Sequence, residues 1–403
     1  MGVENGAENR AENGADDTAA ERMEPGLQIQ TRGARLEDYP TVRDIIAQAF
    51  DSNDEADLWD YLVAHDPALR PEGVRLATAV VAGDRPVACT VVLPRRIRAR
   101  REWVDGAVIT LVACHPEFQN RGFGSASVRD AIRYLYAKGL ALGILYGHPN
   151  YYPRHGFVPV LPRMRTTLRV AGAAAGVAGA GRAGALFRPA QDGDYGALLA
   201  LYDSQLTTYP CAVARSADPW LWKPRNGDQT AVLVAPDRQA YALVTVPPAG
   251  DTLYVAEGAA AGRDAVRRLL DGLLQEATAC GKTEVVLSLP PNHPLAEEAA
   301  MRGAGQTVQA ATAGMAVVAN WGPLLPPRYE VGPDGLHLDG VPVLKAGHAA
   351  MVQLALGYVG ADQLLSSPDD HSCPSIARPT EMTRLRQDFP PAFPKWSLAP
   401  FWH

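Results

Sequence analysis

The fold is decided by one stretch of the sequence, Val112-Ala113-Cys114-His115-Pro116-Glu117-Phe118-Gln119-Asn120-Arg121-Gly122-Phe123-Gly124-Ser125-Ala126. The apolar run from Ala107 to Cys114 predicts a strand that is buried on both faces. Apolar residues at helical spacing predict a helix from about Phe123 to Lys138. Gly122 and Gly124 lack the Cβ atoms that would keep a ligand away from the backbone. We therefore expect a buried strand, a loop open to a ligand and a helix in direct succession.

This loop has the features of an anion site. The N–H groups from Asn120 to Ser125 converge at the start of the helix, where the helix dipole favours negative charge. Arg121 can add a charge-assisted hydrogen bond to phosphate oxygens. The loop therefore predicts a pyrophosphate held largely by backbone atoms. The alternative is a tight strand-to-helix turn that binds nothing.

The elements around this loop predict α/β layers. Strand patterns lie at 27–31, 76–81, 87–93 and 140–146, and a helix pattern lies at 37–50. The second half repeats the order: Phe187-Arg188-Pro189-Ala190 precedes a helix as Thr31-Arg32-Gly33-Ala34 does, and a helix at 263–280 precedes a strand at 283–289. We interpret this as a diverged internal duplication. The Ala/Gly-rich segment 171–185 between the halves is expected to be a linker.

Composition narrows the class of protein. The net charge is −6, so no nucleic-acid partner is expected, and a mildly acidic enzyme suits cationic amine substrates. Five scattered cysteines show no metal-ligand spacing, which predicts no metal site, no disulfide framework and a cytoplasmic location. Residues 1–26 are expected to form a disordered tail, and no apolar run approaches the roughly 20 residues that span a bilayer.

The loop motif Gln119-x-x-Gly122-x-Gly124 resembles the coenzyme A motif of the GNAT (GCN5-related N-acetyltransferase) superfamily, over residues 27 to about 168. The resemblance implies a mixed sheet with helices on both faces. It also implies that the strand residues Val112, Ala113 and Cys114 pair with the pantetheine arm of acetyl-CoA. The diphosphate would lie over the loop residues Gln119, Asn120, Arg121, Gly122, Phe123, Gly124 and Ser125. Cys114 is not expected to act as a nucleophile, because a buried Cys is usually inert.

A second motif, Tyr151-Tyr152-Pro153-Arg154-His155-Gly156-Phe157, follows the strand 140–146. It resembles the YYxRFGF stretch of YhbS-like GNAT proteins and the YGRFGYG stretch of the Eis (enhanced intracellular survival) acetyltransferases. The resemblance implies that Tyr152 is the general acid. A phenol with a pKa of about 10 can protonate the thiolate that leaves a thioester. The alternative is that both tyrosines only pack a short helix.

The whole chain resembles the Eis-type architecture. This implies a catalytic GNAT domain at 27–170, a degenerate GNAT domain without cofactor at 186–310 and a small α+β sterol-carrier-like domain at 311–403. The aromatic end Trp396, Phe401, Trp402 and His403 resembles the family's C-terminus, whose carboxylate enters the first active site. The resemblance therefore implies a catalytic or substrate-site role for His403. It also implies a homo-oligomer, since proteins of this family are often hexamers.

Together these features predict an acetyl-CoA-dependent N-acetyltransferase that transfers the acetyl group to a primary amine of a small cationic molecule by direct attack. Two alternatives remain open. One is a protein lysine or longer-chain acyltransferase, and the other is a non-catalytic protein that binds acyl-CoA or lipid. No membrane partner is expected.

Overall fold

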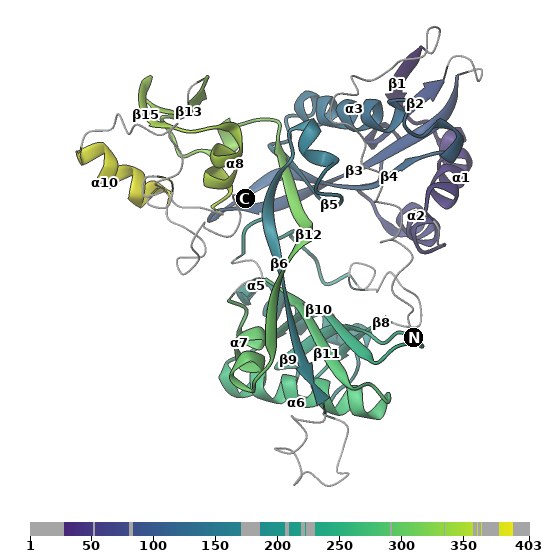
Figure 1. Cartoon of the computed structure of the whole chain (residues 1–403), viewed down its shortest axis with the longest axis vertical. Helices are drawn as coiled ribbons and strands as arrows, with labels where there is room; N and C mark the ends of the chain where they lie inside the picture. Colours follow the sequence, from purple (N-terminus) through teal and green to yellow (C-terminus); the bar gives the residue numbers. More distant parts are fainter. Residues whose placement is uncertain are drawn as a thin grey trace.

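The computed structural model describes residues 28–50, 53–79, 84–170, 186–205, 209–218, 222, 230–290, 292–333, 335–357, 361, 364 and 379–389. The chain forms three units, seen as three lobes in Figure 1. We call residues 28–170 the first unit, residues 186–318 the second unit and residues 319–389 the third unit. The first and second units meet at two long strands, β6 and β12 (Figure 1).

One twelve-stranded sheet runs through the first two units, in the order β1-β2-β3-β4-β5-β12-β6-β11-β10-β9-β8-β7. The strands of the first unit are β1 Ile29–Gly33, β2 Val74–Ala79, β3 Arg85–Ala99, β4 Glu102–Cys114, β5 Leu142–Tyr146 and β6 Val158–Arg169. Those of the second unit are β7 Arg188–Pro189, β8 Thr230–Val234, β9 Ala240–Thr245, β10 Thr252–Ala260, β11 Glu284–Leu289 and β12 Gly305–Val318. Only the pairs β4–β5 and β10–β11 are parallel, so the sheet is mixed as predicted.

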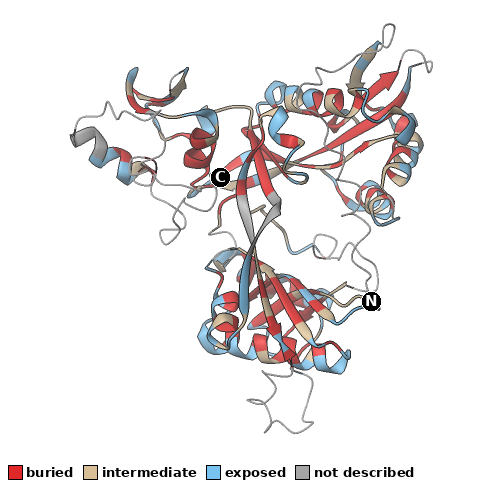
Figure 2. Ribbon diagram, in the orientation of Figure 1, coloured by how far each residue is buried: buried red, intermediate tan, exposed pale blue. Residues whose placement is uncertain are grey.

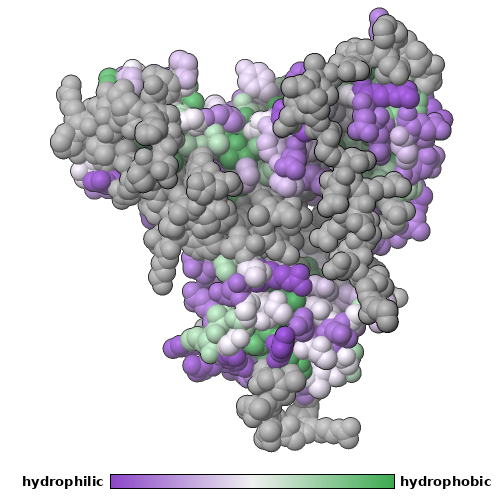
Figure 3. Space-filling model, viewed as in Figure 1, coloured by the Kyte–Doolittle hydropathy of each residue, from purple (hydrophilic) through white to green (hydrophobic). Residues whose placement is uncertain are grey.

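Helices cover both faces of the first unit's sheet. On one face, α1 (Tyr39–Ala49) and α2 (Asp54–His65) pack against β2, β3 and β4, where Ile45 and Trp59 are buried. On the other face, α3 (Phe123–Ala137) buries Val128, Ala131 and Leu135 against the sheet. Most strand residues in both units are buried (Figure 2), whereas the visible surface over α1 is hydrophilic (Figure 3). Burial of one apolar stripe per helix explains why the 3.6-residue periodicity located α1 and α3.

The two units exchange strands. The end of β12 (Gly314–Val318) pairs with β5 of the first unit, and the end of β6 (Met164–Arg169) pairs with β11 of the second unit. Each unit therefore completes its sheet with a strand from the other half of the chain. The expected domain boundary at 310/311 falls inside β12.

The internal duplication is visible at the level of single hydrogen bonds. In the first unit, Arg32 donates two hydrogen bonds to Asp38, of 2.6 and 2.8 Å. In the second unit, Arg188 donates two to Asp194, of 2.6 and 2.9 Å. Both carboxylates also accept a backbone N–H three residues upstream, at the start of α1 and of α5 (Tyr195–Gln205). The second unit adds α6 (Arg263–Ala279) and α7 (Pro294–Met301).

The third unit is small. It contains a three-stranded sheet of β13 (Tyr329–Gly332), β14 (Gly335–Leu338) and β15 (Val341–Lys345), with α8 (His348–Leu356) and α10 (Pro379–Asp388). All residues from Ala350 to Leu356 are buried, so α8 is covered on every face. The sequence did not predict α2, α7, β15 or α10.

Candidate active site

The central feature of the site is an opening between two parallel strands. β4 and β5 pair only at Ala107–Gly143 and Val108–Ile144, and then separate. Beyond this point β4 contains a bulge, in which Leu111 and Val112 lie opposite the single residue Thr90 of β3. Leu111 has a φ of +48°, a left-handed conformation that is costly for a side chain of this kind. The bulge redirects the end of β4, and strain of this sort concentrates at functional sites.

The predicted coenzyme loop lies at the end of β4. Asn120 and Gly122 both adopt left-handed conformations, with φ values of +60° and +87°, and Gly122 begins α3. The first hydrogen bond inside α3 runs from the Ala126 N–H to the Gly122 carbonyl at 2.9 Å. The N–H groups of Phe123, Gly124 and Ser125 therefore have no partner inside the helix. Arg121 is exposed beside them. This arrangement fits a diphosphate, because backbone donors and a helix dipole point at one place.

The residues expected to line the pantetheine arm lie at the edge of the opening. Val112 and Cys114 are half-buried and Ala113 is buried. The side chain of Gln119 donates a hydrogen bond of 3.3 Å to the carbonyl of Cys114, which ties the loop to the strand. Burial raises the pKa of the Cys114 thiol to about 11, although the backbone N–H of Gly124 lowers it in part. The thiol stays protonated at neutral pH, which suits a lining residue better than a nucleophile.

Tyr152 lies on the other side of the opening, in a short 3-10 helix (Tyr152–His155) that follows β5. Its side chain is buried, and its ring packs 5.6 Å from Phe157 and against the backbone of Gly147, where a Cβ atom would overlap the ring. Burial raises the pKa of Tyr152 to about 12. The phenol therefore remains a proton donor over the whole neutral range.

Two other parts of the chain support this tyrosine. Met315 and Val317 of β12, strand residues of the second unit, belong to the same buried cluster as Tyr152 and Phe157. In the third unit, His348 Nε2 lies 3.4 Å from the Gly156 carbonyl, and Gln353 Nε2 donates a hydrogen bond of 3.0 Å to the Pro159 carbonyl. The segment that carries Tyr152 is thus packed by all three units.

Trp59 of α2 cannot line an acceptor cleft, because it is 2% exposed and packs edge-on to Tyr39 in the core. Asp60 on the same helix is ion-paired with Arg43. His403 and the aromatic C-terminus lie outside the described residues. Sequence reasoning did not predict the bulge at Leu111 or the contacts that β12 and α8 make with the site. No local sequence pattern indicates them.

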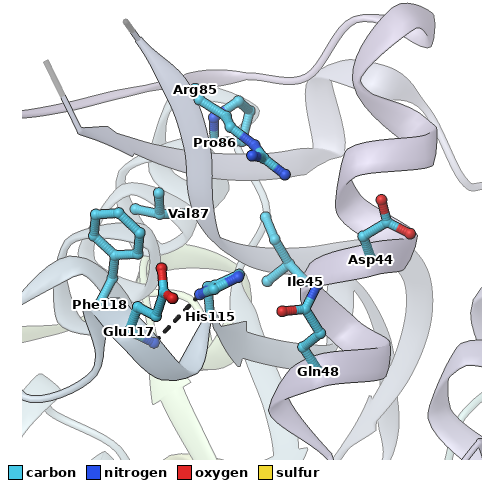
Figure 4. Close-up of a pocket in the computed structure, with 9 residues that line it drawn as sticks. All are labelled: Asp44, Ile45, Gln48, Arg85, Pro86, Val87, His115, Glu117 and Phe118. Carbon is cyan, nitrogen blue, oxygen red and sulfur yellow. Dashed lines mark hydrogen bonds between the residues drawn. The ribbon is translucent and has the colours of Figure 1, made fainter. Parts of the chain in front are cut away.

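A pocket of about 140 Å³ lies next to this site (Figure 4). It is formed by α1, the start of β3 and the turn after β4, on the sheet face opposite α3. Its lining mixes carboxylates, a guanidinium, an imidazole and apolar side chains: Asp44, Ile45, Gln48, Arg85, Pro86, Val87, His115, Glu117 and Phe118. His115 Nδ1 accepts a hydrogen bond of 3.3 Å from the Glu117 N–H (Figure 4). The pocket therefore has a mixed polar and apolar lining and adjoins the coenzyme loop from the α1 side.

Within the described part of the chain, no group of three His, Cys, Asp or Glu side chains is arranged to hold a metal ion. None of the helices described there combines the length and the apolar character that crossing a bilayer demands.

Comparison with known proteins defines the class of the first unit. The family model of the acetyltransferase (GNAT) domain matches residues 30–160. An uncharacterized N-acetyltransferase of Escherichia coli K12, YjhQ, is 31% identical over 125 residues, a match that spans 30% of this chain and 65% of that protein. Residues 30–160 are therefore a GNAT acetyltransferase domain, and the chain carries an enzyme domain of the N-acyltransferase class.

Solved structures extend the likeness in fold to nearly the whole chain. A GCN5-related N-acetyltransferase from Anabaena variabilis superposes with a TM-score of 0.67 at 14% identity, over 90% of this chain and 97% of its own. Eis1 from Mycobacterium abscessus superposes with a TM-score of 0.56 at 15% identity, over 85% of this chain and 94% of its own. The mixed α/β fold with helices on both faces of the sheet is thus that of GNAT proteins.

Proposed function

We propose that this protein is an acetyl-CoA-dependent N-acetyltransferase that acetylates a primary amine of a small cationic molecule. The observation that carries the proposal is the coenzyme loop beside the β4–β5 opening, with a buried phenol across from it. The GNAT family uses acetyl-CoA, and the N–H groups at the start of α3, which have no partner inside the helix, suit its diphosphate. The net charge of −6 and the carboxylates Asp54, Glu55 and Asp57 in the first turn of α2 favour a cationic acceptor.

In the proposed reaction the residues of β4 orient the thioester. The backbone of Val112, Ala113 and Cys114 would pair with the pantetheine arm, as a neighbouring strand would. The neutral amine attacks the thioester carbon, the new C–N bond forms and the C–S bond breaks. Tyr152 gives its proton to the departing sulfur, the amine loses a proton to solvent, and Tyr152 then regains a proton from solvent. The raised pKa of Tyr152 ensures that this proton is present.

We further propose the Eis-like architecture, in which the second unit is a degenerate GNAT domain and the third a sterol-carrier-like domain. The likeness in fold to Eis1 and the repeated Arg–Asp contacts of α1 and α5 support it. A cytoplasmic homo-oligomer and a role for the His403 carboxylate at the first active site complete this proposal. Deleting Trp402 and His403 should then lower kcat strongly. Full activity of the truncated protein would mean that the C-terminus has only a packing role.

The proposed acid is tested by Tyr152→Phe. We expect kcat to fall at least tenfold, in the range of lost general acid catalysis, while the Kd for coenzyme A stays within about twofold. The matched control is Tyr202→Phe, which removes a buried phenol of the second unit whose hydroxyl donates to the Val213 carbonyl at 2.6 Å. Tyr202→Phe should lower the free energy of unfolding and leave kcat unchanged. An unchanged kcat in Tyr152→Phe would remove Tyr152 from the mechanism.

The proposal as a whole is tested with the full-length protein by calorimetry with coenzyme A and by release of thiol from acetyl-CoA. Profiling small amines, lysine peptides and longer acyl-CoAs separates the acceptor and acyl classes. Tight acyl-CoA binding without thiol release for any amine would favour a binding protein. No uptake of coenzyme A would overturn the proposed function.

A further inference from the structure

Tyr151 is oriented differently from the neighbouring Tyr152. Its hydroxyl oxygen lies 3.3 Å from the position that a Cβ atom would take on Gly124, in the first turn of α3. Its ring stands edge-on to Tyr152, with centroids 5.0 Å apart at 82°, and to His155, with centroids 5.1 Å apart at 67°. Two rings thus support a half-buried phenol that reaches from the segment after β5 to the coenzyme loop.

This contact depends on a glycine. An alanine at 124 would put a methyl group closer to the phenol oxygen than almost any real contact allows, so the ring would have to shift by a few tenths of an ångström. Cys114 Cβ lies 3.9 Å from the same position. The hydroxyl of Tyr151 therefore lies at the first turn of α3, where the N–H groups of Phe123, Gly124 and Ser125 have no partner inside the helix.

We propose that Tyr151 is a coenzyme-binding residue whose hydroxyl donates a hydrogen bond to a diphosphate oxygen of acetyl-CoA. The inference rests on the proposed function and deepens it, because it divides the tyrosine pair into two roles. A phenol beside the N–H groups of a helix start adds one donor for the same anion. A hydrogen bond to a charged group is worth enough to change affinity about tenfold. Tyr151 then holds the coenzyme, whereas Tyr152 protonates the leaving sulfur.

The test compares Tyr151→Phe with Tyr152→Phe in the full-length protein. For Tyr151→Phe we expect the Kd for coenzyme A, measured by calorimetry, to rise about tenfold and kcat at saturating acetyl-CoA to stay within about twofold. Acetyl-pantetheine, a donor without the diphosphate, should be used equally well by Tyr151→Phe and by the unmodified protein. Thermal unfolding of both variants checks that they are folded.

Three results would overturn the inference. They are an unchanged Kd in Tyr151→Phe, a fall in kcat with Kd preserved, and an equal loss with acetyl-pantetheine. If the unmodified protein itself takes up no coenzyme A, the proposed function fails first and this inference with it. Failure of the inference alone leaves coenzyme binding and the effect of Tyr152→Phe intact.

A double-mutant cycle checks the contact independently. Gly124→Ala should weaken coenzyme binding more in the unmodified background than in Tyr151→Phe, because the added methyl group then meets no hydroxyl. Purely additive effects of the two substitutions on Kd would contradict the placement of the phenol over Gly124.

Discussion

The first and second units share one scaffold but differ where a coenzyme would bind. In the first unit residues 115–122 separate β4 from α3, whereas only Ala261 and Gly262 separate β10 from α6. The second unit repeats the strand bulge, at Ala256 in β10. Its loop is nevertheless too short to curl around a diphosphate. The shared arrangement of strands and helices is therefore not enough to form a coenzyme site. The loop between the strand and the helix also has to be long enough to surround a diphosphate.

The strand edge that is open in the first unit is occupied in the second. His293 Nε2 donates a hydrogen bond of 2.9 Å to the Gly258 carbonyl, and the side chain of Gln205 bonds to both the N–H and the carbonyl of Ala260. At the bulge, Glu257 forms a bidentate ion pair with Arg215, at 2.7 and 2.8 Å. Among the described residues, no side-chain hydrogen bond of this kind reaches the backbone of Val112.

The two units also differ in the proton donor. Tyr152 lies four residues before Gly156, a left-handed glycine that leads into β6. The corresponding glycine of the second unit is Gly303, which is also left-handed and leads into β12, and four residues before it lies Ala299. The second unit therefore has a strand edge covered by side chains and no tyrosine at the position that matches Tyr152. The second unit nevertheless supplies β12 to the sheet of the first unit.

The largest expected effect concerns His293, whose side chain covers the strand edge of the second unit. His293 is 2% exposed, its Nδ1 accepts the Leu295 N–H at 3.2 Å, and burial lowers its pKa to about 4. The neutral imidazole thus stabilises the fold fully above pH 6.5, and this stabilisation is lost as pH falls from about 6.5 to about 4. The loss amounts to at most about 3 kcal/mol.

Denaturant unfolding at several pH values measures this effect. His293→Gln should be less stable at pH 7.5 and should lack this part of the pH dependence, whereas His65→Gln, at an exposed position, should keep it. An unchanged pH dependence in His293→Gln would show that the neutral imidazole of His293 does not contribute to the free energy of unfolding in this way.

The next effect compares two glycines in matching places. Gly122 and Gly262 both precede a helix, with φ values of +87° and +84°. Gly122→Ala and Gly262→Ala should each lower the free energy of unfolding by about 1 kcal/mol, because side chains disfavour positive φ. Only Gly122→Ala should raise the Kd for coenzyme A, by about tenfold or 1.4 kcal/mol. Equal losses of affinity for coenzyme A in both variants would show that the two units do not differ in coenzyme binding.

The smallest effect should follow from cutting the chain between the units. A protease site inserted into residues 171–185, followed by cleavage, should leave the two fragments together on size-exclusion chromatography with activity retained. The physical reason is the exchange of strands, since β6 pairs with β11 and β12 with β5. Separation of the fragments without denaturant would mean that the exchanged strands do not hold the units together.

The sequence predicted most of the first unit. The apolar period located α1 and α3, and Gly122 located the start of α3 to the residue. The expected strand 107–114 lies within β4, which begins earlier because its first part alternates and is only partly buried. α7 was not predicted, because a helix of only two turns shows too short a period. The roles of Tyr152 and of the coenzyme loop remain predictions that the proposed experiments test.

By itself the sequence determined the coenzyme loop, the tyrosine pair and the duplication, because each of these depends on residues close together in the chain. Glycines fix local backbone geometry, and a helix or strand shows its period wherever one face is buried. Only the tertiary structure decided that β6 and β12 change places, that His293 and Gln205 occupy the second cleft and that Tyr151 reaches Gly124. These features join residues far apart in the chain, and the partner of a strand edge or the direction of a side chain is set by packing rather than by local pattern.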